Sequence, residues 1–105
     1  MVQIKLLKNI EILSCNFQMV WDKDMDGGFF NWGDATITVG IKSIKKDPMY
    51  TYSILSHEIM EAILTGMGAR FSSSRTRENY LFSFDHQTFE NAIQLHAQAI
   101  LKFTC

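Results

Sequence analysis

The chain has 105 residues, the length of one domain, and 47% of them are hydrophobic, which is enough to build a core. The net charge of −1 provides no basic surface of the kind that binds nucleic acid, and the apolar runs are too short to span a membrane. The two cysteines, Cys15 and Cys105, are far apart and form no disulfide framework, so we expect a single cytoplasmic domain over residues 1–105.

The first half of the chain is predicted to form strands. Short alternating or apolar runs end at turn signals, of which Asp26-Gly27-Gly28 is the strongest. The clearest run is rich in β-branched residues. The predicted strands are Val2–Leu7, Ile10–Ser14, Phe17–Trp21, Phe29–Trp32 and Ala35–Ile41. They indicate a small, mostly antiparallel sheet in which Phe29–Trp32 pairs back across the turn.

The second half is predicted to form a helix, a strand and another helix. Asp47 can cap free amides and Pro48 suits a first helical position, so the first helix runs from about Pro48 to about Thr65. Gly66 and Gly68 are its stop signals.

After the polar segment 71–79, the sequence predicts a strand over Tyr80–Phe84 and a helix from about His86 to about Lys102, capped by Asp85. The apolar stripe of this helix comprises Phe89, Ile93, His96 and Ile100. The order of the elements predicts an α+β domain: a small antiparallel sheet, a helix, a further strand and a C-terminal helix.

Three titratable side chains, those of His57, Glu58 and Glu61, interrupt the apolar sequence of the first helix. A helix that is apolar nearly all round is normally buried, and burying charged groups is costly unless something compensates. A metal ion compensates because it binds imidazole and carboxylate together. His57 and Glu61 share one face of the helix, and Glu58 lies about 100° around from His57. This is close to the H-E-x-x-H motif of zinc peptidases, with Glu61 in place of the second histidine.

The third ligand of a hydrolytic zinc site should come from another element, because such sites have three protein ligands and one open position. His86 lies where the strand turns into the last helix, a junction at which packing fixes side-chain geometry. His96 lies about 15 Å from His86 along the same helix, within the apolar stripe, so we predict a hydrogen-bonded core histidine there. The predicted zinc site is therefore His57, Glu61 and His86.

The predicted chemistry is metal-dependent hydrolysis of a peptide or amide bond in a peptide or protein substrate. Glu58 would be the general base that assists the attack of metal-bound water. An oxyanion donor is not singled out; the candidates are Tyr50, Tyr52, Tyr80, Arg70, Arg75 and Arg77. The strand Ala35–Ile41 is a candidate edge for an extended peptide.

The segment Leu55–Ile63 resembles the active helix of small zincin-like metallopeptidases. More narrowly, it is similar to short phage and prophage proteins with H-E-[IL]-[LM]-E-A-[IL] and a histidine about two dozen residues later, here His86. The resemblance covers roughly residues 35–103 and implies a zinc site of His57, Glu61 and His86, with Glu58 as base. The departure from H-E-x-x-H adds negative charge, which would make the zinc a weaker Lewis acid.

Two alternatives remain open. One is a non-catalytic, metal-stabilised phage or prophage protein with a structural or interaction role, in which Cys15 or His96 supplies a fourth ligand. The other is a binding module without metal, in which His57 and Glu61 pair with Arg70 or another cation.

A further motif, Asp22–Gly27, matches the start of an EF-hand loop, but Gly33 occupies the position of the bidentate glutamate. The predicted flanks are strands, where an EF-hand needs helices. An acidic hairpin loop is therefore predicted.

Overall fold

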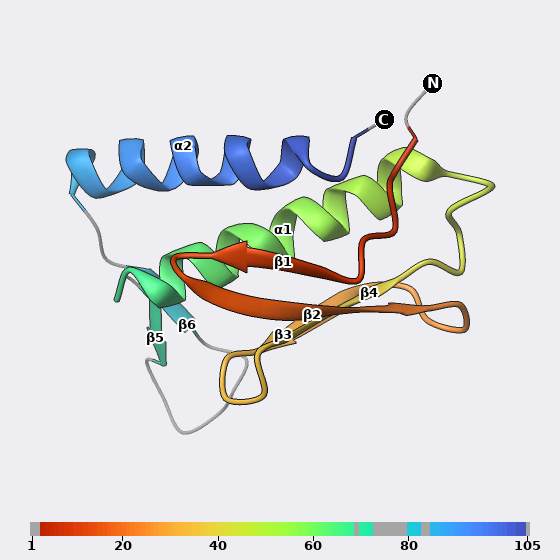
Figure 1. The fold of residues 1–105 in the computed structure, drawn as a ribbon, viewed down its shortest axis with the longest axis horizontal. Coiled ribbons are helices and arrows are strands. Elements are labelled where there is room, and N and C mark those ends of the chain that lie inside the picture. The colour runs from red at the N-terminus through yellow and green to blue at the C-terminus, as the bar shows by residue number, and fades with distance from the viewer. Residues whose placement is uncertain (1–2, 69, 73–79, 83–84, 105) are drawn as a thin grey trace.

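A four-stranded sheet and two long helices make up most of this computed structural model, which describes residues 3–68, 70–72, 80–82 and 85–104 (Figure 1). The sheet strands are β1 (Asn9–Ile12), β2 (Cys15–Asp22), β3 (Gly28–Asn31) and β4 (Thr36–Gly40). The helices are α1 (Pro48–Gly66) and α2 (His86–Leu101), and between them β5 (Arg70–Ser72) pairs with β6 (Tyr80–Phe82). The predicted α+β class is confirmed at this coarse level.

The sheet is mixed and its strand order is β1-β2-β4-β3. The β1–β2 and β3–β4 pairs are antiparallel, whereas β2 and β4 are parallel neighbours. Two predictions are therefore wrong: Phe29–Trp32 does not pair back onto the preceding strand, and Ala35–Ile41 is an inner strand. β3, not β4, forms the edge of the sheet.

The loop between β2 and β3 explains this order, because it carries the chain across the end of β4. Its carbonyl groups accept hydrogen bonds from the β4 end: Gly40 N donates to Gly27 O at 2.7 Å and Lys42 N donates to Met25 O at 3.2 Å. A Cβ atom at position 40 would overlap the Met25 carbonyl. Glycine at position 40 therefore allows the two backbones to cross.

The predicted strand Val2–Leu7 is wrong over its described residues, which form only an isolated bridge between Ile4 and Thr104. This N-terminal segment packs instead against the end of the chain. The Trp21 indole N–H donates to the Leu7 carbonyl at 2.8 Å, and its ring meets Phe103 edge to face with centroids 6.1 Å apart. The alternating residues therefore pair with the C-terminal segment and not with a sheet.

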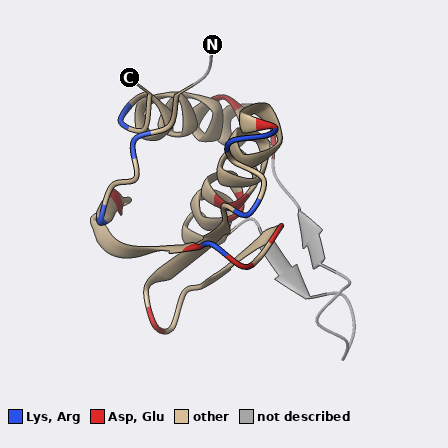
Figure 2. Cartoon of the chain, turned by 90° about the vertical axis from the view of Figure 1, so that its right-hand side faces the viewer, with Lys and Arg blue, Asp and Glu red and all other residues tan. Residues whose placement is uncertain are grey.

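The core lies between the sheet and α1. Buried apolar side chains come from both layers and include Phe17, Ile37, Val39, Leu55, Ile59 and Ile63. α1 crosses one face of the sheet, and α2 packs alongside α1 and against β1 (Figure 1). Along the described chain, lysine positions are spread over several separate segments, which Figure 2 shows in blue.

Both helices begin at the predicted caps. The Asp47 carboxylate accepts from Tyr50 N at 3.2 Å, and the Asp85 carboxylate accepts from Thr88 N at 2.8 Å. The observed ends of α1 and α2 differ from the predicted ends by one residue. The first three residues of the predicted strand Tyr80–Phe84 form β6, and the other two lie outside the described part of the chain.

The predicted apolar stripe of α2 is only partly correct. Ile100 is buried, but Phe89 and Ile93 are exposed, and the buried positions nearer the N-terminus are occupied by alanine. Small side chains at the contact let α2 approach α1 closely, which leaves the larger residues on the outer side. In the part of the chain that the structure describes, no helix has the length and apolarity needed to cross a membrane.

Candidate metal centre

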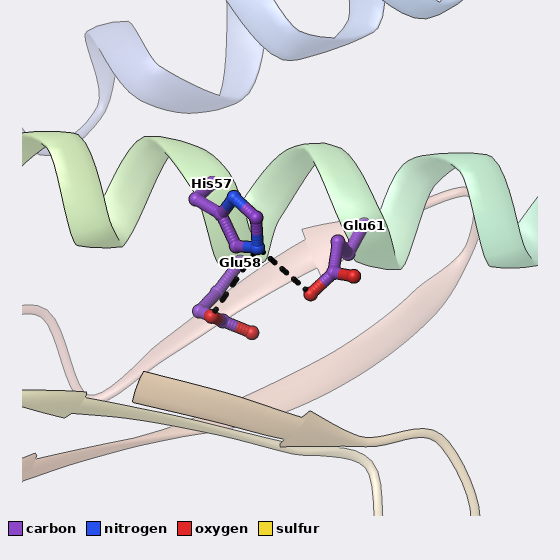
Figure 3. A group of neighbouring side chains, drawn as sticks. All are labelled: His57, Glu58 and Glu61. Atoms are coloured by element: carbon purple, nitrogen blue, oxygen red, sulfur yellow. Dashed lines mark ion pairs between the residues drawn. The ribbon is translucent and has the colours of Figure 1, made fainter. Parts of the chain in front are cut away.

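α1 brings together His57, Glu58 and Glu61 midway along its length (Figure 3). One potential ligand atom from each side chain lies within 4.8 Å of the other two. His57 Nε2 is 3.2 Å from Glu61 Oε2 and 4.0 Å from Glu58 Oε2. The described residues contain no second group of three such side chains. We refer to these three side chains as the α1 cluster.

One side of the α1 cluster is exposed to solvent and the other is buried. The His57 side chain is 65% exposed, whereas those of Glu58 and Glu61 are 6% and 19% exposed. Glu58 points from α1 toward the sheet (Figure 3). Beneath it lies Gly28 of β3, where a Cβ atom would come within 3.1 Å of Glu58 Cγ. The cluster therefore lies where α1 packs closely against the start of the edge strand.

The distances in the α1 cluster fit a divalent ion. Zinc binds nitrogen and oxygen at about 2.0–2.2 Å, so two ligands at a tetrahedral site are about 3.4 Å apart. The His57–Glu61 distance of 3.2 Å agrees with this spacing, and the His57–Glu58 distance of 4.0 Å needs only a small side-chain rotation. Two carboxylates and a neutral imidazole also balance the charge of a divalent ion. The α1 cluster can hold a metal ion.

His86, the predicted third ligand, is not part of the α1 cluster. Its side chain is 83% exposed at the start of α2, and its Nε2 lies 2.9 Å from Glu90 Oε1 on the same helix. The Ser56 hydroxyl oxygen lies 2.7 Å from His96 Nε2, and His86 is about 15 Å from His96 along α2. Because His96 lies beside the residue next to His57, His86 is about three helical turns away from the α1 cluster along α2. Its role as a ligand stays a prediction.

Glu58 is the member of the cluster that the sequence analysis assigned to proton transfer and not to metal binding. The sequence spacing already indicates that the Glu58 carboxylate can approach His57 and Glu61, because a flexible side chain about 100° around the helix can reach toward their face. Its burial against β3 depends on the tertiary packing and could not be read from the sequence.

Within the described part of the chain, neither His96 nor Cys15 joins the α1 cluster to complete a closed metal site. His96 is hydrogen-bonded to Ser56, as predicted, but it is half-buried and does not belong to the core. Cys15 is half-buried in β2 and lies outside the α1 cluster. His57 and Glu61 pair with each other, while the side chain of Arg70, their predicted partner in a site without metal, lies outside the described residues.

Two carboxylates of the acidic segment Asp22–Gly27 accept hydrogen bonds from other groups of the protein. Asp22 Oδ1 accepts from Asp24 N at 2.9 Å, and Asp26 Oδ1 accepts from Ser43 Oγ at 3.0 Å. The flanking segments are strands, as predicted, but β2 and β3 are not paired, so the loop closes no hairpin. Among the described residues, these aspartates form no metal-ligating group.

Two of the candidate oxyanion donors lie in the first half of α1. Tyr50 is exposed and Tyr52 is half-buried. The other four, Tyr80, Arg70, Arg75 and Arg77, have side chains outside the described part of the structure. The donor therefore stays unassigned.

A groove of about 410 Å³ opens directly beside the α1 cluster. It is lined by Gly27, Gly28, Ser53, Ile54, His57 and Glu58. One wall is thus the start of the edge strand, and the other is the face of α1 that carries His57. The groove gives a molecule from solvent direct access to the cluster.

Comparison with family models, curated proteins and solved structures finds no match. The function of the chain therefore has to be argued from the α1 cluster and the groove beside it.

Proposed function

We propose that this chain is a small zincin-like hydrolase that uses a divalent metal ion, with zinc as the first choice, to cleave a peptide or amide bond. The observation that carries the proposal is the α1 cluster, in which one imidazole and two carboxylates converge beside an open groove. His57 and Glu61 would hold the ion. The resemblance of the α1 sequence to short phage and prophage proteins supports the same assignment.

When bound, the ion would supply Lewis acidity, polarising a carbonyl group and lowering the pKa of water. Glu58 would accept a proton from the attacking water molecule and deliver it to the leaving amine. Its carboxylate is 4.0 Å from His57 Nε2 and is nearly buried, which supports this role. The exposed side of His57 leaves room for the substrate and water.

The peptide substrate would reach the α1 cluster along β3. The edge of the sheet next to the cluster is formed by β3, and an extended peptide can add to such an edge through main-chain hydrogen bonds. This replaces Ala35–Ile41 as the candidate substrate strand, because that segment is enclosed between two neighbours.

The third ligand is the point that the experiment has to decide. His86 is proposed from the sequence, whereas Glu58 already lies in the α1 cluster. An ion held only by residues 57, 58 and 61 would attach no second element to α1, which disfavours a purely structural metal. The alternative of a non-catalytic, metal-stabilised protein would therefore need a ligand from elsewhere in the chain.

Elemental mass spectrometry and peptide hydrolysis test the proposal. We expect about one zinc ion per chain in the wild type and none in His57→Ala. Glu58→Gln should keep its zinc and lose hydrolysis, while His86→Ala should lose zinc. Glu11→Gln, which changes an exposed glutamate of β1, is the matched control.

Three results would change the assignment. A wild-type protein without metal, or hydrolysis that survives Glu58→Gln, would refute the proposed mechanism. Zinc retained by His86→Ala but lost by Glu58→Gln would make Glu58 the third ligand and remove it as the base.

A further inference from the structure

Two consecutive glycines, Gly27 and Gly28, line one side of the groove beside the α1 cluster. At Gly28, a Cβ atom would lie 2.9 Å from Ile54 Cγ2 and 2.7 Å from the Thr38 carbonyl oxygen, so no larger residue fits the floor. Gly27 has a φ of +85°, and nothing lies within 4 Å of the position that its Cβ would occupy. Backbone atoms alone therefore form this side of the groove, and Gly28 lets β3 pack closely against α1 there.

The lining of the groove defines the chemistry of its occupant. Ile54 supplies an apolar wall, and the Ser53 hydroxyl is occupied by its own helix, because it donates to the Tyr50 carbonyl at 2.7 Å. Glu58 is the acidic side chain of the lining, and among the described residues no lysine or arginine is part of it. An acidic occupant would be repelled by Glu58, and a basic one would be repelled by the metal ion that the proposed function places on His57 and Glu61. An apolar occupant would gain from burial against Ile54.

The size of the groove is suited to part of a peptide. Its volume of about 410 Å³ lies in the lower part of the range of about 300–1,000 Å³ typical of ligand pockets. Two of its lining residues, His57 and Glu58, belong to the α1 cluster. Whatever side chain fills the groove therefore lies next to the bond that the cluster would act on.

We propose that this groove is a specificity pocket for an uncharged aliphatic or aromatic side chain of a peptide, and that Ser53 and Ile54 set the size it accepts. The inference rests on the proposed function, because it takes the occupant to be part of the substrate. The α1 cluster would act on the peptide bond, whereas the groove would determine which peptides bind.

Ser53→Phe is the variant that tests the pocket. Position 53 is exposed on the helix, so phenylalanine can be placed there without disturbing the core, and it would fill the groove without changing the α1 cluster. Gln94→Phe makes the same kind of change at an exposed position of α2, away from the groove, and is the control.

The probes are blocked hexapeptides in which each position in turn is Leu, Lys or Glu. Binding to the metal-free protein is followed by NMR titration, and hydrolysis by the zinc-loaded protein is followed separately. We expect the best leucine peptide to be favoured over its glutamate counterpart by about tenfold or more, as a pocket for an apolar side chain predicts. Ser53→Phe should abolish this preference, and Gln94→Phe should retain it.

The two readouts separate the inference from the proposed function. Leucine-selective binding with shifts at Gly27, Gly28 and Ile54, but without hydrolysis, would support the pocket and refute the enzyme. Hydrolysis without side-chain preference would refute the pocket alone. Equal affinity for leucine, lysine and glutamate peptides, or a preference unchanged in Ser53→Phe, would overturn the inference.

Discussion

The Ser56 hydroxyl oxygen lies 2.7 Å from His96 Nε2, and this hydrogen bond joins α1 to α2 one residue before His57. The pair is half-buried in a contact that is otherwise largely apolar. Because both partners are fixed on helices, the bond is compatible with one register of α2 along α1 and favours it over shifted ones. It thereby sets how far the start of α2, with His86, lies from the α1 cluster.

We predict that the Ser56–His96 bond contributes about 1 kcal/mol to the free energy of unfolding, as is usual for one hydrogen bond between side chains. A double-mutant cycle with Ser56→Ala and His96→Ala, measured by urea denaturation, should give a coupling energy of that size. Ser53→Ala, which removes a hydroxyl bonded only to its own helix, is the control. Strictly additive effects of the two substitutions would show that the bond does not couple the helices.

Gly40→Ala should destabilise the protein by about 2 kcal/mol or more, the size expected when an atom is forced into a filled space. The added methyl group would overlap the Met25 carbonyl where the loop crosses β4. Both sides of this contact are backbone, so neither can turn away. Thermal denaturation monitored by circular dichroism measures the effect. Gly33→Ala, where the nearest atom is the Asn31 Oδ1 at 3.3 Å, should change the melting temperature far less.

Asp85 should contribute to the acid sensitivity of α2. The backbone N–H of Thr88 donates to its carboxylate and holds the pKa of Asp85 below its ordinary value of 3.8. A lowered pKa in the folded protein means that the stabilisation is complete above the unfolded value and is lost as the pH falls through the folded value. Asp85→Asn, which keeps a capping oxygen but cannot titrate, should therefore lose less stability below pH 3.8 than the wild type does.

Zinc should stabilise the folded chain through the α1 cluster. A ligand that binds only the folded protein adds about 2.7 kcal/mol at a free concentration one hundred times its Kd. We expect zinc to raise the melting temperature of the wild type and of Glu11→Gln, and a chelator to reverse the change. His57→Ala and Glu61→Gln each remove a ligand and should abolish the shift. A zinc-dependent shift that survives in both variants would locate the ion elsewhere.

The helices could be predicted almost to the residue because their signals are local. Asp47-Pro48 marks the start of α1 and Asp85 marks the start of α2, each by a contact within the first helical turn. Gly66 and Gly68 mark the end of α1. The convergence of His57 and Glu61 followed in the same way, since the spacing of four residues within a helix fixes it.

The pairing of distant segments could not be predicted from such signals. The Asp26-Gly27-Gly28 turn indicates a hairpin, but only the tertiary structure shows that β4 separates β2 from β3. The apolar periodicity of α2 likewise predicts an apolar face, but it does not determine which residues of that face contact α1. The position of His86 relative to the α1 cluster depends on that contact, which is why the third ligand was not settled by the sequence.

The place of β4 between two strands that precede it has a consequence for how the protein folds. A growing chain that has emerged only as far as β3 can form the β2–β3 hairpin that its turn favours. If that hairpin forms first, it has to open before β4 can insert, and assembly of the sheet then includes an exchange of strand partners. Where this early pairing competes with the native one, substitutions that weaken the Asp26-Gly27-Gly28 turn should speed the formation of the sheet, which stopped-flow refolding would measure.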